Sequence, residues 1–198
     1  MRQTFLAALL GLATALPAAA QEIPLPVLSR YMTELGTVET SFTQVNSDGT
    51  LSTGKLYIQR PGRMRFEYDP PNNALVIAGG GQLAIYDPVS NEPPEQYPLR
   101  QTPLNLILQR TVDFEVSDAV LAHGSDGLTT TVLAHDPERP ELGTIELVFS
   151  NDPVELRQWV ITDEGGSETT VILGALERRD RLSAFLFDIQ RTTEDRMR

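Results

Sequence analysis

The sequence contains no cysteine, and this absence limits both its fold and its chemistry. Without cysteine the chain forms no disulfide bond, so its apolar core alone must stabilise the fold. It also offers no cysteine for lipidation at a cleavage site, which means that the protein is not itself a lipoprotein.

Histidine is nearly as scarce, because His123 and His135 are the only two in the chain. Two histidines without cysteine do not make a structural zinc site of the usual kinds, and the acidic residues lack calcium-loop spacing. No serine lies in a Gly-x-Ser-x-Gly elbow, and His135-Asp136 precedes a proline, which is more typical of a loop than of a catalytic pair. We therefore expect no catalytic residue, no metal and no cofactor. A hydrolase that uses His135 and Asp136 remains the enzyme alternative.

Basic residues are outnumbered, with 16 Lys and Arg against 27 Asp and Glu and a formal net charge of −11. Such a charge repels nucleic-acid phosphates and anionic lipid surfaces, and it favours solubility. We expect a monomer that has no nucleic-acid partner.

Long apolar runs are missing as well, since no segment reaches the length of about 18 residues that a membrane-spanning helix needs. The only apolar run, Phe5 to Leu16, follows the basic Arg2 and precedes the small residues Ala18 to Ala20. This pattern predicts a signal peptide over residues 1–20 and one domain over residues 21–198 in a compartment beyond the inner membrane.

The rest of the chain has the patterns of an antiparallel β domain. A helix is predicted before Gly36, with Leu28, Tyr31, Met32 and Leu35 on one face, and a second helix after Thr102-Pro103. Turn signals about 8–12 residues apart separate the predicted strands, which include one over Val112–Val116 and a last one over Phe185–Ile189. Residues from Thr192 to Arg198 are interpreted as a frayed tail. Together these patterns predict about ten strands and two or three short helices in one domain.

The central stretch, Gly54 to Pro88, contains the most informative alternation. Leu56, Ile58 and Arg60 share one strand face, because successive side chains point to opposite sides of a sheet. In the next strand Met64, Phe66 and Tyr68 share one face, while Arg63 and Arg65 occupy the other and are expected to be solvated. Arg60 differs from them, because it ends an apolar row and needs a partner there.

Large apolar side chains also occur on both faces of several strands in this stretch, among them Tyr57, Ile85 and Tyr86. A sheet that packs on one side only would need a single apolar face. A sheet that curves around a cavity, with helices closing it, could use both.

Several motifs in the same stretch resemble the LolA family of periplasmic carriers of outer-membrane lipoproteins. They are Ser41-Phe42-Thr43-Gln44, the run from Gly54 through Arg60-Pro61-Gly62-Arg63 to Tyr68, the turn Gly81 to Pro88, and Thr102 to Leu108. Phe66 and Ala84 stand where better-known members have tryptophan, and the only tryptophan here is Trp159.

The resemblance implies a mainly β (α+β) fold, an unclosed antiparallel half-barrel of about ten or eleven strands with short helices as a lid over an apolar cavity. It implies that Arg60 is a lid latch that bonds to lid-helix backbone in the empty, closed form. It assigns the acyl-chain cavity to Leu56, Ile58, Met64, Phe66 and Tyr68, and the lid helix to Leu104, Leu106, Ile107 and Leu108.

The function that the resemblance implies is transport of lipoproteins across the periplasm. The partners would be triacylated lipoproteins and an inner-membrane ATP-driven transporter that releases them. Whether an outer-membrane acceptor lipoprotein also takes part stays open. The alternatives are carriage of another lipid on the same half-barrel, or a sensing domain that binds a regulatory partner.

Overall fold

The structure of the protein is a computed structural model that describes residues 22–90, 92–116 and 118–197. The signal peptide predicted over residues 1–20 lies outside the described residues. None of the helices in the described ranges is long and apolar enough to cross a membrane.

Strands make up most of the described chain, and the helices are few and short. In chain order the elements are α1 (Leu25–Glu34), β1 (Thr37–Val45), β2 (Leu51–Gln59), β3 (Arg63–Tyr68), β4 (Leu75–Gly79), β5 (Gln82–Tyr86), β6 (Glu95–Pro98), the 3-10 helix η1 (Leu99–Gln101), α2 (Asn105–Leu108), β7 (Val120–Ser125), β8 (Thr129–His135), η2 (Pro140–Leu142), β9 (Thr144–Asn151), β10 (Val154–Thr162), β11 (Glu168–Leu173), β12 (Glu177–Arg178), η3 (Ala184–Phe187) and α3 (Ile189–Arg196).

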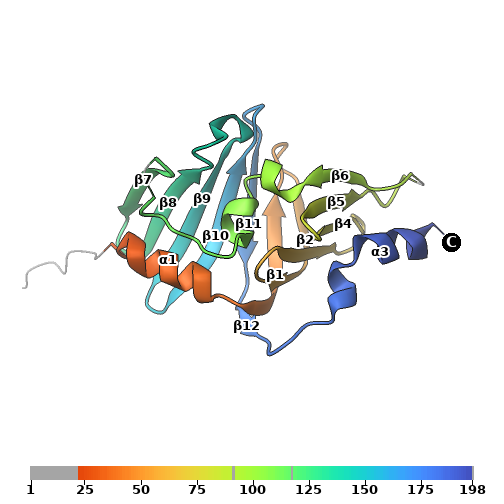
Figure 1. Ribbon diagram of the computed structural model, residues 1–198, viewed down its shortest axis with the longest axis horizontal. Coiled ribbons are helices and arrows are strands. Elements are labelled where there is room, and N and C mark those ends of the chain that lie inside the picture. Colours follow the sequence, from red (N-terminus) through yellow and green to blue (C-terminus); the bar gives the residue numbers. More distant parts are fainter. Residues whose placement is uncertain (1–21, 91, 117, 198) are drawn as a thin grey trace, which may run out of the picture.

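The strands form one antiparallel sheet that does not close on itself. Its order is β6-β5-β4-β3-β2-β1-β11-β10-β9-β8-β7, and β12 pairs with the beginning of β1. The described sheet has 12 strands, against the ten or eleven predicted, and they include the two-residue strand β12 in the charged stretch after Leu176. The expected fold class, an unclosed antiparallel half-barrel, is confirmed (Figure 1).

Contacts between distant strands show how strongly the sheet curves. Phe66 on β3 and Trp159 on β10 are four strand steps apart, which is about 19 Å in a flat sheet. Their ring centroids are only 6.3 Å apart, and the rings meet edge to face. The two halves of the sheet therefore face each other across a shared interior.

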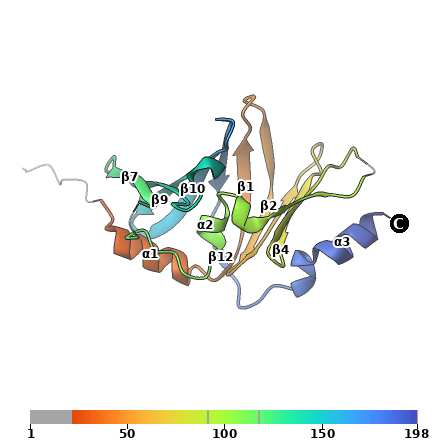
Figure 2. The same ribbon diagram turned by 45° about the horizontal axis from the view of Figure 1, so that its top comes forward.

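Helices α1 and α2 lie on the concave side of this sheet (Figures 1 and 2). The helical spacing predicted for the N-terminal segment is confirmed, because Leu28, Met32 and Leu35 are all buried in the main apolar cluster. Tyr31 packs edge to face on Phe149 of β9, at 5.8 Å between ring centroids.

The convex side of β4 and β5 carries a second, smaller apolar cluster of Leu75, Ile77, Ala84 and Tyr86. The C-terminal segment covers it, since Ile189 packs against the cluster and the Tyr86 hydroxyl donates to the Ile189 carbonyl at 2.9 Å. Of the apolar side chains that the sequence analysis noted on a second strand face, Tyr86 therefore packs against the chain's own C-terminal end.

The strand predicted over Phe185–Ile189 and the frayed tail after Thr192 are both wrong, because η3 and α3 occupy these residues. Asp188 is the reason, since its carboxylate caps α3 by accepting the Arg191 N–H at 2.9 Å.

The strand predicted over Val112–Val116 is also wrong, although Val112 and Phe114 are buried. Their backbone N–H groups donate to side chains of α1 instead of to a strand: Val112 to the Thr33 hydroxyl at 3.2 Å, and Phe114 to the Ser29 hydroxyl at 2.9 Å. The alternating side chains therefore fix a connection that runs along α1.

A substitution at Gly79 tests whether the C-terminal segment packs on β4, because a Cβ at this position would collide with the Phe187 carbonyl oxygen. We expect Gly79→Ala to lower the free energy of unfolding by about 1–3 kcal/mol and to speed hydrogen exchange of α3. Gly124→Ala is the matched control, because nothing lies within 4 Å of its new Cβ, and it should leave α3 exchange unchanged. Equal exchange of α3 in both variants would contradict this seating.

Candidate functional site

The five residues predicted to line the cavity lie together on the concave face. Leu56 and Ile58 on β2 face Phe66 and Met64 on β3 in the strand register, and all four are at most 5% exposed. Tyr68 is partly buried and packs against the same cluster. The alternation therefore placed these side chains on one buried face of the sheet, and their role in lining an acyl-chain cavity stays a prediction.

An aromatic group spans the interior from one half of the sheet to the other. Phe42 on β1 meets Phe66 and Tyr68 at 5.1 Å between ring centroids in each case, and Phe66 meets Trp159. Trp159 is fully buried. The alternation of β10 does not reveal this in the sequence, because the register of the strand shifts between Leu156 and Gln158. This bulge lets Leu156 and Trp159, three positions apart, both face inward.

Tyr68 brings a polar group into this aromatic surrounding. Its hydroxyl donates to the Gln44 side-chain carbonyl oxygen at 2.6 Å. Burial raises the pKa of Tyr68 to about 12, because ionisation would place a charge in an apolar setting. The phenol therefore stays neutral and serves as a hydrogen-bond donor.

The predicted lid residues also pack into the interior. Leu104, Ile107 and Leu108 are each at most 8% exposed, and the partly buried Leu106 packs against the main cluster. The helix itself is shorter than expected, because α2 begins at Asn105 and Thr102 is not its N-cap. The Thr102 hydroxyl donates instead to the Leu99 carbonyl of η1 at 2.8 Å.

Arg60 lies where the turn between β2 and β3 meets the end of α2. Its Nη2 donates to the carbonyl oxygen of Gln109, directly after the helix. Two residues on, the Gly62 N–H donates to the Leu108 carbonyl at 2.8 Å. The Arg60 N–H donates to the Gly36 carbonyl at 3.0 Å, so the same turn also holds the chain that follows α1.

The guanidinium of Arg60 is only partly satisfied by these contacts. Its Nε and Nη1 atoms are buried and have no hydrogen-bond partner among the described residues. Burial lowers the pKa of Arg60 to about 10, since an apolar surrounding disfavours the charged form. The contact with the end of α2 therefore carries an energetic cost.

The other two arginines of this stretch differ from each other. Arg63 is exposed, as predicted, but the prediction of a solvated Arg65 is wrong. Arg65 has a side chain only 15% exposed, its Nε pairs with Glu67 at 2.7 Å, and its Nη1 donates to the Leu186 carbonyl at 3.0 Å. Its partner belongs to η3, a segment that the sequence did not place on this face.

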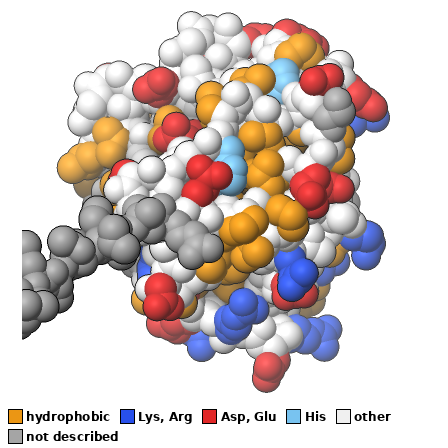
Figure 3. All heavy atoms as spheres, turned by 90° about the vertical axis from the view of Figure 1, so that its left-hand side faces the viewer, with side chains coloured by type: hydrophobic (Ala, Val, Ile, Leu, Met, Phe, Trp, Pro, Cys, Tyr) orange, Lys and Arg blue, Asp and Glu red, His pale blue; other side chains and the backbone are white. Residues whose placement is uncertain are grey.

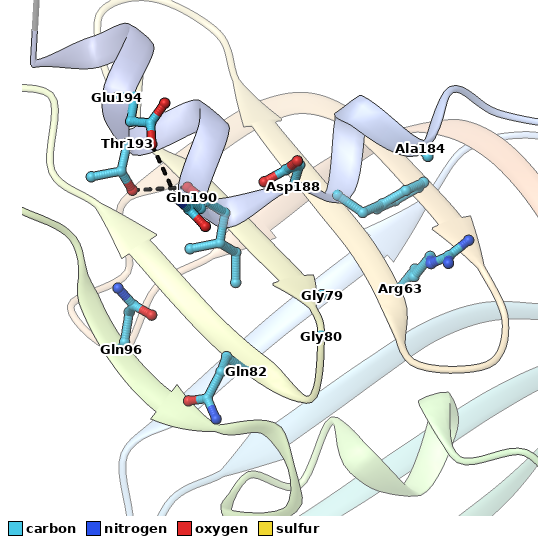
Figure 4. A pocket seen from close by; sticks show the side chains of 12 residues that line it. Arg63, Gly79, Gly80, Gln82, Gln96, Ala184, Asp188, Gln190, Thr193 and Glu194 are labelled. Carbon is cyan, nitrogen blue, oxygen red and sulfur yellow. Dashed lines mark hydrogen bonds between the residues drawn. The ribbon is translucent and has the colours of Figure 1, made fainter.

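A cavity of about 630 Å³ lies on the convex side, beside this C-terminal segment (Figure 4). Its lining combines polar side chains, including Gln82, Gln96, Gln190 and Glu194, with the apolar Ala184, Phe187 and Ile189.

His135 and Asp136 do not form a catalytic pair in this geometry. His135 Nε2 lies 2.6 Å from the Asp118 carbonyl oxygen, and the Asp136 carboxylate pairs with Arg139 at 2.6 Å. In the described ranges, no group of three or more histidine and acidic side chains is placed to hold a metal ion.

An unclosed antiparallel half-barrel with short helices packed over its apolar concave face defines the class of this protein. The family model described as outer membrane lipoprotein carrier protein LolA matches residues 33–190. The chain belongs to the LolA family.

Its relatives are distant but cover most of the chain. An outer-membrane lipoprotein carrier protein of Pseudomonas paraeruginosa is 26% identical over 198 residues, which span 94% of each chain. The protein of the same name from Coxiella burnetii strain CbuK_Q154 is 30% identical over 173 residues, 82% of this chain and 81% of that one. A solved Vibrio parahaemolyticus domain, provisionally assigned to outer membrane lipoprotein sorting, has a TM-score of 0.52 at 9% identity over 85% of this chain and 97% of its own.

Replacing Arg60 tests whether its contact stabilises α2 locally without contributing much to the global free energy of unfolding. We expect Arg60→Leu to speed hydrogen exchange of α2, because one of its two backbone links to the turn is lost. The global free energy of unfolding should change by less than about 1 kcal/mol, since the incompletely paired guanidinium is removed at the same time. Arg63→Leu, on the exposed face, is the control and should leave α2 exchange unchanged. Unaltered α2 exchange in Arg60→Leu would contradict the latch.

Proposed function

We propose that this protein is a periplasmic carrier that binds the acyl chains of lipoproteins released from the inner membrane and delivers them to the outer membrane. The observation that carries this proposal is the pair of bonds from Arg60 and Gly62 to the end of α2, at the edge of the apolar interior. Membership in the LolA family and the names of the relatives support the same role.

The concave interior suits acyl chains in its chemistry. Apart from the Tyr68 hydroxyl, the proposed wall residues are apolar, and the four most buried belong to neighbouring strands. The side chains of α2 pack into the same cluster, so cargo has to displace them. Opening of α2 is therefore coupled to loading, and closing competes with the bound chains.

The free energy of burying acyl chains shows why the closed lid has to compete with the cargo. Each buried methylene contributes about 0.8 kcal/mol, so three fully enclosed long acyl chains would approach or exceed roughly 20 kcal/mol. Non-covalent affinity saturates near that value, and a carrier that bound so tightly would not release its cargo. We infer partial enclosure of the chains and a closed state that favours release.

The proposed partners are triacylated lipoproteins and an inner-membrane ATP-driven transporter that supplies them. The proposed role is that of a carrier and not of an enzyme, which agrees with the separate partners of His135 and Asp136. The signal peptide predicted before Gln21 supports a periplasmic location.

Depletion of the protein tests this function directly. We expect lipoproteins destined for the outer membrane to accumulate at the inner membrane, and wild-type protein to restore their sorting. When the Arg60→Leu variant is supplied in place of the wild-type protein, it should accumulate bound lipoprotein, because a loosened lid favours the loaded state and slows release. Membrane fractionation and analysis of the purified carrier measure both effects, with Arg63→Leu as the control. Unaltered sorting after depletion would overturn the proposed function.

A further inference from the structure

A second cavity lies beside α2 at the edge of the main apolar cluster, which includes its lining residues Val112, Phe114 and Ala134. Its volume is about 350 Å³, at the small end of the range for ligand pockets. Its walls come from α2, from the connection after α2, from β8 and from the turn that follows β8. Half of its lining is apolar and consists of Leu106, Val112, Phe114, Val116, Ala119, Ala134 and Pro137.

Fixed backbone contacts hold the inner wall of this cavity. The N–H groups of Val112 and Phe114 donate to Thr33 and Ser29 of α1, and His135 donates its N–H to the Ala119 carbonyl at 3.0 Å. The wall formed by α2, by contrast, depends on the links from Arg60 and Gly62. The cavity therefore has one fixed side and one side that the latch controls.

The cavity also reaches an apolar part of the outer surface. Val116 lines it and is 49% exposed. Val27 at the start of α1 and Leu121 on β7 are 39% and 52% exposed. Figure 3 shows apolar side chains gathered on the end of the molecule where β7 and the start of α1 lie.

The rim of the cavity selects by charge. Three carboxylates line it, Asp113, Asp136 and Glu138, against the single cation Arg139. Arg139 pairs with Asp136 at 2.6 Å, which leaves two acidic side chains in excess. An amphiphile with an anionic head group is repelled at this rim, whereas an uncharged or cationic one is accepted.

We propose that this cavity is a receiving site for one acyl chain of the cargo, whose linked head group is uncharged or cationic. The chain enters past Val116 and packs against Leu106, from where it reaches the interior once α2 opens. This inference rests on the proposed carrier function and adds the entry point.

The test uses the full mature protein and single-chain amphiphiles below their critical micelle concentrations. Calorimetry should detect binding of dodecyltrimethylammonium and dodecyl maltoside, with laurate weaker by about tenfold at low salt and less so at high salt. Replacing the dodecyl by a decyl chain should weaken binding by about fifteenfold, as expected for two buried methylenes. Amide NMR shifts should change at Val112, Val116 and Ala134.

The blocking variant is Val116→Asp, which places a charge at the half-exposed mouth. It should abolish amphiphile binding and slow lipoprotein loading, while Val89→Asp, at an 89% exposed position elsewhere, should change neither. Amphiphile binding retained by Val116→Asp, or lipoprotein loading at the normal rate, would overturn the receiving site and leave the carrier function standing. Unaltered sorting on depletion, with amphiphile binding lost in Val116→Asp, would overturn only the carrier function and its cargo.

Discussion

The contact between the β2–β3 turn and the end of α2 is the interaction on which the position of this short helix depends. A helix of four residues is not stable by itself, and its last carbonyls have no partner within the helix. Arg60 and Gly62 donate to two carbonyls there, those of Gln109 and Leu108. A cation suits this end of a helix, but two further donor atoms of Arg60 are buried without a partner. The attachment of α2 is therefore specific but incompletely satisfied, and in the proposed function this cost keeps the lid reversible.

The sheet supports this arrangement by having two apolar faces in β4 and β5. Val76, Ala78 and Leu83 pack toward the concave interior, whereas Leu75, Ile77 and Tyr86 face the C-terminal segment. Packing on the convex side stabilises the wall without using the interior surface. The proposed opening of α2 would therefore leave the outer face of these strands covered.

The concave face was predictable from the sequence because it depends on a local period of two. Leu56, Ile58, Met64 and Phe66 were placed on it by alternation, and Arg60 stood out because it ended the same row.

The errors came from tertiary contacts. Val112 and Phe114 alternate like a strand, but their N–H groups bond to α1 hydroxyls; Arg65 resembles a surface charge, but η3 covers it. Trp159 was missed as a wall residue because a bulge breaks the period of β10. The second cavity joins segments distant in sequence, so no local pattern indicates it.

The absence of cysteine allows the latch to be measured directly. Spin labels on cysteines introduced at Arg63 and Arg110, both exposed, report the distance between the β2–β3 turn and the residues after α2. For the empty protein the account predicts a single narrow distance distribution, which Arg60→Leu broadens toward longer distances. The same narrow distribution in Arg60→Leu and in the parent protein would contradict the claim that Arg60 holds the lid.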